Sequence, residues 1–72
     1  MKYHRLNGPA IAALREAAGI SQADLARECG ISPSHLSHME SDRRQCSPPV
    51  AARIALRLGV ALADIMSPVE AA

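Results

Sequence analysis

The sequence predicts an all-α fold, a compact bundle of five short helices. Its 72 residues suit a single domain near the lower size limit for a self-sufficient hydrophobic core. Hydrophobic residues make up 49% of the chain, but Tyr3 is the only aromatic, so the core must be built from Leu, Ile, Val, Ala and Met, which favours helices. Ser, Pro and Gly recur at positions that begin and end short helices, and no stretch alternates as a half-buried strand would.

The first predicted helix begins at "NGP" and ends at Gly19. Pro9 suits a first-turn position, and glycine commonly ends a helix. The residues expected to face the core are Ile11, Leu14 and Ala18. Arg15 lies one turn beyond Ile11, close to this apolar face, and an unpaired charge would be costly there.

The second and third predicted helices are joined by a tight turn. Ser21 is the expected N-cap of "SQADLAREC", which ends at Gly30. Ser32 caps the next helix, and Pro33 lies in its first turn. Because one residue separates Gly30 from Ser32, the pattern predicts a helix-turn-helix.

The fourth predicted helix, "PPVAARIALRL", begins after Ser47 and ends at Gly59, and a short fifth helix is expected in "ALADIM". Their core-facing residues are expected to be Val50, Ile54, Leu58, Val60, Leu62 and Ile65. Arg53 and Arg57 share another face of the fourth helix, which we expect to be solvated. The helical domain then spans residues 8–66, between an N-terminal arm, 1–7, and a loose C-terminal tail, 67–72.

Charge and cysteine content leave the function open. The net charge is +1, but residues 1–63 carry all eight Lys and Arg against five acids, a balance of +3, so overall charge neither supports nor excludes nucleic acid. Cys29 and Cys46 have no metal-site spacing and are expected to be reduced thiols. No apolar run is as long as a membrane span or resembles a signal peptide, so we expect a cytoplasmic protein.

The third predicted helix has an unusual polar face. Leu36, Met39 and Glu40 fall on one side, and the opposite side, here called the polar stripe, comprises Pro33, Ser34, Ser37, His38 and Ser41. Solvated helix faces usually favour longer side chains, whereas short ones allow close approach to a surface. Ser and His can hydrogen-bond to base edges in a DNA major groove. The stripe alone is equally compatible with a protein-binding or merely solvated surface.

The segment "SQADLARECGISPSHLSHME" resembles the helix-turn-helix of the phage Cro and lambda-repressor family, also called the XRE type of bacterial regulators. The matching features are Ser21-Gln22, Leu25-Ala26, Gly30-Ile31, Leu36, Met39, Glu40 and Gly59-Val60. The resemblance covers roughly residues 8–66 and implies a lambda-repressor-like fold that binds DNA through residues 32–41.

The resemblance also implies roles for individual residues. It pairs Arg15 with Glu40 to orient the recognition helix, and it assigns Gln22 and His35 to DNA phosphates. The base-facing positions are Ser32, Pro33, Ser34, Ser37 and His38. Two departures limit the transfer, because Pro33 offers only apolar contact and no Arg in the stripe can grip guanine.

Several charged side chains flank the recognition helix. Arg43 and Arg44, just beyond it, are expected to hold phosphates, and their alternative role is solubility. In the arm, Lys2, His4 and Arg5 either reach DNA or belong to a disordered start.

We therefore expect a sequence-specific double-stranded DNA-binding transcriptional regulator, a repressor, that binds as a homodimer. Leu56, Leu62 and Met66 are candidates for the dimer contact. No metal, cofactor or small-molecule ligand is expected. The alternative is a protein-interaction module, an adaptor or antitoxin-like protein. An enzyme is not expected, because His35 and His38 share a surface helix without a cleft or a carboxylate triad.

Overall fold

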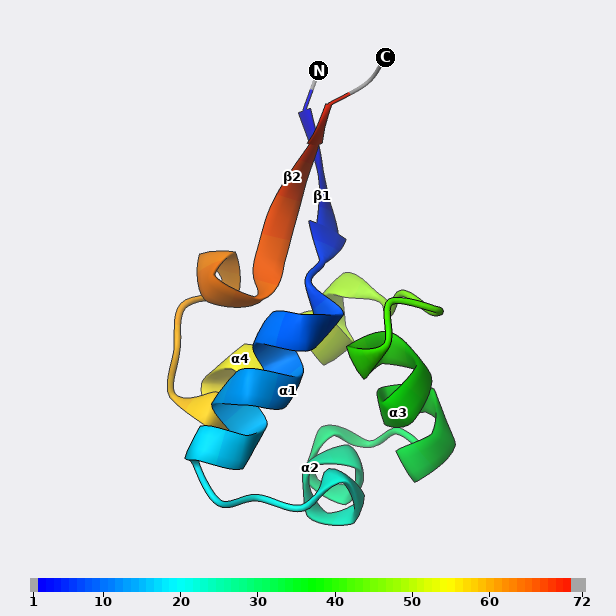
Figure 1. Ribbon diagram of the computed structural model, residues 1–72, viewed down its shortest axis with the longest axis vertical. Helices are drawn as coiled ribbons and strands as arrows, with labels where there is room; N and C mark the ends of the chain where they lie inside the picture. Colours follow the sequence, from blue (N-terminus) through cyan, green and yellow to red (C-terminus); the bar gives the residue numbers. More distant parts are fainter. Residues whose placement is uncertain (1, 71–72) are drawn as a thin grey trace.

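Four α-helices and one 3-10 helix form a body from which a two-stranded ribbon projects in the computed structural model (Figure 1). The structure describes residues 2–70, with side chains from 5 to 66. The helical elements are α1 (Gly8–Ala17), α2 (Gln22–Cys29), α3 (Pro33–Glu40), α4 (Pro48–Leu58) and the 3-10 helix η1 (Leu62–Ile65). The ribbon comprises β1 (Lys2–Leu6) and β2 (Met66–Glu70).

Side-chain caps begin the first three helices. Ser21 and Ser32 accept hydrogen bonds from the backbone N–H groups of Asp24 and His35, each at 3.0 Å, as the sequence predicts. Asn7 does the same for α1, accepting from the N–H of Ala10 at 3.1 Å. These bonds satisfy N–H groups that have no partner within the helix.

The fourth helix begins differently. Ser47 occupies the N-cap position and the helix begins directly after it, as the sequence predicts, but the Ser47 side chain makes no capping hydrogen bond. Pro48 at the first helical position has no N–H to satisfy and a backbone angle already suited to the helix. Gly59 ends α4 with a positive φ of 71°, as the sequence predicts.

The fifth helix is shorter than expected. It is the four-residue 3-10 helix η1, begun by a hydrogen bond of 2.9 Å from the N–H of Ala61 to the carboxylate of Asp64. The body therefore has four α-helices rather than five, and the all-α helix-turn-helix fold is confirmed.

The expectation of no strands is wrong. β1 pairs antiparallel with β2, from Lys2 opposite Glu70 to Leu6 opposite Met66. β1 lies within the predicted arm, and β2 begins at Met66, the last residue of the predicted helical domain, and continues into the predicted tail. Residues 1, 71 and 72 lie outside the described part. Each strand has only five residues and pairs with the far end of the chain, so no local pattern marks it.

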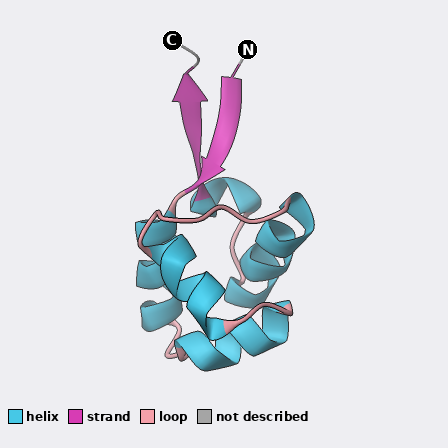
Figure 2. Ribbon diagram, turned by 90° about the vertical axis from the view of Figure 1, so that its right-hand side faces the viewer, coloured by secondary structure: helices cyan, strands magenta, loops and turns pink. Residues whose placement is uncertain are grey.

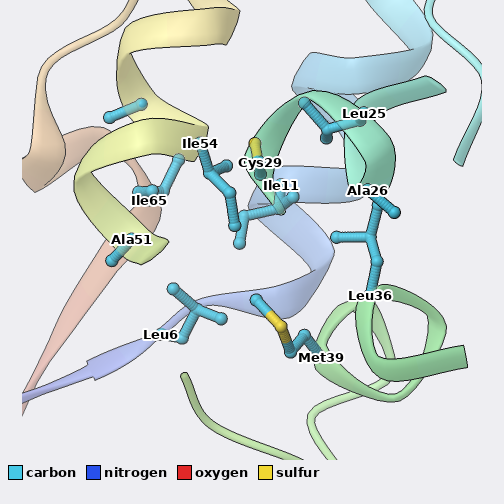
Figure 3. Close-up of a cluster of buried hydrophobic side chains, with 11 residues drawn as sticks. Leu6, Ile11, Leu25, Ala26, Cys29, Leu36, Met39, Ala51, Ile54 and Ile65 are labelled. Carbon is cyan, nitrogen blue, oxygen red and sulfur yellow. The ribbon is translucent and has the colours of Figure 1, made fainter. Parts of the chain in front are cut away.

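The core lies between the helices (Figure 3). Its buried hydrophobic residues are Leu6, Ile11, Leu25, Ala26, Cys29, Leu36, Met39, Ala51, Ile54, Ala55 and Ile65. Leu14, Val50, Leu58 and Val60 pack against it at the edge. Ala18 and Leu62, which were expected to face the core, are exposed, because α1 ends at Ala17 and the last turn is a 3-10 helix. No helix within residues 2–70 is long and apolar enough to cross a membrane.

Candidate nucleic-acid interface

The helix α3 is fixed to the body by one face only. Leu36 and Met39 are fully buried, and they extend into the core from α3 (Figure 3). The opposite side is exposed at every position of the polar stripe, Pro33, Ser34, Ser37, His38 and Ser41, and at Ser32. A helix anchored in this way presents short polar side chains to solvent without needing to move.

A buried ion pair holds the C-terminal end of α3. Arg15 Nε lies 2.7 Å from Oε2 of Glu40, and its Nη2 lies 3.1 Å from Oε1. The two side chains are only 12% and 7% exposed. The same guanidinium donates to the carbonyl of Ile20 at 2.8 Å, so it also holds the segment that precedes α2. The structure thus brings together the two residues that the resemblance pairs.

The electrostatics of this pair favour the charged forms. The hydrogen bond to Glu40 is the main cause that raises the pKa of Arg15, against the opposing effect of burial. A bidentate guanidinium-carboxylate contact is the strongest geometry for such a pair. Removal of either partner would leave the other charge buried without compensation.

Gln22 lies at the start of α2 and joins the same network. Its side-chain amide donates to Oε1 of Glu40 at 2.9 Å, and the residue is half-buried. One of its two amide hydrogens is therefore used inside the protein, and the other is left for an external acceptor. The structure places Gln22 beside the end of α3.

His35 and Ser32 also make internal contacts. Nε2 of His35 lies 3.2 Å from the carbonyl oxygen of Gln45, and the imidazole is half-buried. Ser32 uses its hydroxyl oxygen as the α3 cap, which leaves its O–H free to donate. Ser41, at the end of the stripe, also uses its hydroxyl internally, donating to the carbonyl oxygens of Ser37 and His38 at 3.2 and 3.1 Å.

The loop that follows α3 contains the two expected phosphate contacts. Arg43 and Arg44 are exposed, and neither makes an ion pair within the described part of the chain. Asp42, just before them, has a positive φ of 61° and accepts the N–H of Gly8 at 3.0 Å. Gly8 lies so close to α3 that an added Cβ would come within 2.1 Å of the carbonyl oxygen of Met39.

Sequence reasoning missed Gly8, Asp42 and Gln45, which position the end of α3. Oε1 of Gln45 accepts the backbone N–H of Leu6 at 2.8 Å and so ties the loop to β1. All three contacts join residues more than thirty positions apart. Only "NGP" at the start of α1 gave a local signal, and it indicated the beginning of a helix rather than a close approach.

Arg53 and Arg57 are exposed, as expected of a solvated face, and both also contact α2. Arg57 pairs with Glu28, and Nη1 of Arg53 lies 3.5 Å from the carbonyl oxygen of Cys29. Both lie outside the polar stripe.

The cysteines are free. Burial is the main cause that raises the pKa of both thiols, Cys29 in the core and Cys46 at its edge. Among the described residues, no three His, Cys, Asp or Glu side chains are grouped to hold a metal ion.

Two helices joined across residues 30–32, the second exposing a polar face, define the class as a helix-turn-helix domain. A family model described as helix-turn-helix matches residues 11–65, and the chain belongs to this family, of the XRE type. A comparison with curated proteins gave no match.

Solved structures of regulators share the fold. The clp gene regulator ClgR from Corynebacterium glutamicum has a TM-score of 0.76 and 32% identity, with 79% of this chain and 61% of that chain covered. The restriction-modification controller protein C.AhdI from Aeromonas hydrophila has a TM-score of 0.74 and 28% identity, over 79% and 86% of the chains. SinR, a master regulator for biofilm formation solved in complex with DNA, has 0.73 and 26%, over 79% and 95%. The match thus spans less than two thirds of ClgR.

Proposed function

We propose that this protein is a sequence-specific double-stranded DNA-binding transcriptional regulator that acts as a repressor. The observation that carries the proposal is the exposed polar stripe on a helix whose other face is locked into the core. A helix of this kind fits a major groove, where short side chains allow close approach to base edges. The description of SinR as a DNA complex supports it.

The base contacts are assigned to one face of α3. Ser34, Ser37 and His38 supply hydrogen-bonding groups, and Pro33 supplies an apolar contact of the kind that suits a thymine methyl group. Ser32 contributes its O–H, because its oxygen already caps the helix. With no Arg in this set, specificity depends on several modest contacts rather than on one strong guanine contact.

The phosphate contacts are assigned to residues around that face. Arg43 and Arg44 lie in the loop after α3 with unpaired guanidinium groups, which suits charge-assisted bonds to phosphate oxygens. Gln22 offers its second amide hydrogen, and His35 contributes from the first turn of α3. These contacts set the register of the helix in the groove and carry no sequence information of their own.

The regulator is proposed to act in the cytoplasm as a homodimer on two-fold related half-sites. A single short recognition helix contacts few base pairs, so pairing of two domains multiplies both affinity and specificity. No cofactor is part of this proposal.

The deciding experiment is selection of binding sites from a random duplex library, followed by titration of the best site at two salt concentrations. The Ser34→Ala/His38→Ala variant should lose most of its preference for that site over random DNA. Ser47→Ala is the matched control, because this exposed serine lies outside α3 and makes no capping bond. Absence of any enriched motif, with weak salt-sensitive binding to every duplex, would contradict the proposal.

A protein-interaction module is the second candidate. It is favoured by Leu56, whose side chain on α4 is 82% exposed, and by Leu62 at 46%. Apolar side chains of this size are common anchors for a protein partner. Partner binding that falls with Leu56→Ser and is insensitive to Arg43→Ala and Arg44→Ala would support this function instead.

A further inference from the structure

The ribbon of β1 and β2 projects from the end of the body opposite α2, and beyond its base, where η1 lies next to β2, no helix accompanies it (Figures 1 and 2). A two-stranded ribbon has two free edges, and each edge carries backbone N–H and C=O groups without a partner in the sheet. Such a ribbon is marginally stable in water unless further strands or a packing surface join it.

Two hydrogen bonds at the base of the ribbon establish which backbone groups point outward. The N–H of Asn7 donates to the carbonyl of Ile65 at 2.8 Å, so these two residues face each other across the ladder. The N–H of Leu6, one residue away, points to the other side and donates to Oε1 of Gln45 at 2.8 Å. Outward and inward positions alternate along an antiparallel pair.

The outer edge of β1 therefore presents the backbone groups of Lys2, His4 and Leu6. Gln45 already occupies the N–H of Leu6. The sheet has only two strands among the described residues, so no further strand lies opposite Lys2 and His4, which are the open positions of this edge.

The outer edge of β2 is blocked at its centre. Pro68 lies directly opposite His4, at a position whose backbone points outward from the ribbon. Proline has no N–H, so it cannot donate to an added strand there. Of the two edges, β1 is the one open to a further strand.

We propose that the free edge of β1 is a dimerisation surface that pairs with β1 of a second copy. In the two-fold antiparallel register that puts Lys2 opposite His4 of the second copy, both open residues of each chain exchange hydrogen bonds. If His4 lay opposite His4 of the second copy, Lys2 would lie opposite Leu6, whose N–H is already bonded to Gln45. If Lys2 lay opposite Lys2 of the second copy, His4 would have no residue opposite it. The open backbone groups of Lys2 and His4 are therefore all paired only in the register that places Lys2 opposite His4 of the second copy.

The two-fold axis of this register passes through Tyr3, the only aromatic residue of the chain. Residue 3 of each copy lies opposite its own counterpart, as a two-fold antiparallel pairing requires. The inference supplies a contact surface for the homodimer of the proposed function. Its test uses no DNA, so its failure leaves the DNA-binding proposal standing.

The test is sedimentation equilibrium of the full chain and of two substitutions at His4. His4→Pro removes the outward N–H and keeps the ladder to β2, since Pro68 already lies at the equivalent place on the other strand. We expect a wild-type dimer whose dissociation constant rises at least about tenfold in His4→Pro, because two symmetry-related hydrogen bonds are lost. His4→Ala retains the N–H and should dimerise like the wild type.

Two spectroscopic measurements make the result decisive. The α-protons of Leu6 and Met66 should keep their mutual nuclear Overhauser effect in His4→Pro, which shows that the ribbon is intact. In a mixture of isotope-labelled and unlabelled wild-type chains, a filtered spectrum should show contact between the Tyr3 α-protons of the two copies. A monomeric wild type, a dimer without this contact, or a dimer that dissociates on Leu56→Ser and not on His4→Pro would overturn the proposal.

Discussion

Glu40 is the one charged side chain buried to this degree among the described residues, and it accepts hydrogen bonds from two other side chains. Arg15 and Gln22 both donate to its carboxylate, so helices α1, α2 and α3 meet there. This contact holds the C-terminal end of α3 against α1 and α2, and it therefore sets the orientation of the helix that carries the polar stripe.

The first prediction concerns this carboxylate. Glu40→Ala leaves Arg15 buried without its partner and should lower the free energy of unfolding by on the order of 3 kcal/mol. Urea unfolding followed by circular dichroism measures this. Glu16→Ala is the matched control, because that carboxylate is 71% exposed and 3.8 Å from Arg15, and it should change the free energy by less than about 1 kcal/mol. An unchanged stability in Glu40→Ala would refute the structural role.

A second residue-scale prediction concerns Gly8. The Cβ of Gly8→Ala would lie 2.1 Å from the carbonyl oxygen of Met39, a backbone atom that cannot rotate away. We expect a loss of about 3 kcal/mol in the free energy of unfolding, measured by thermal and urea denaturation. Pro9→Ala, at the exposed neighbouring position, should cost far less. Equal stability of the two variants would mean that α1 and α3 separate easily at this point.

At the scale of elements, the proposed function divides DNA binding between α3 and the loop after it. Arg43→Ala and Arg44→Ala should each weaken binding to every duplex. Each should also make the fall of log affinity with log salt concentration less steep, by about one unit of slope. Fluorescence anisotropy with the selected site and a random duplex measures both effects. Arg57→Ala is the control, because that side chain pairs with Glu28 on α2. A loss confined to the selected site would reassign these arginines to base contacts.

The helices could be predicted from sequence because their signals are local. A serine cap or a glycine stop acts within a few residues, as at Ser21 and Gly30. The strands, the close approach of Gly8 and the Gln45 contact depend on residues that meet only after folding. The polar stripe could be predicted for the same reason as the helices, whereas the internal contacts of Gln22 and His35 could not.

At the scale of the whole molecule, the pH dependence of stability reports on the two thiols. Burial raises the pKa of Cys29 and Cys46 in the folded state, while the unfolded chain keeps ordinary thiol values of about 8.5. The stability that comes from keeping these groups neutral is fully present below the unfolded pKa. It is lost as the pH rises through the folded pKa, because the unfolded state then binds fewer protons than the folded state.

The free energy of unfolding of the reduced protein should therefore fall above about pH 8.5, by up to about 1.4 kcal/mol per pH unit for each thiol. Urea unfolding between pH 7 and pH 10 under a phosphine reductant measures the slope. The Cys29→Ala/Cys46→Ala variant will be less stable at every pH because a buried sulfur is removed, but its profile should be flatter. An identical slope in both proteins would show that other groups govern the alkaline loss. A flatter slope in the variant would show that the thiols stay protonated in the folded protein at a pH where they ionise in the unfolded chain.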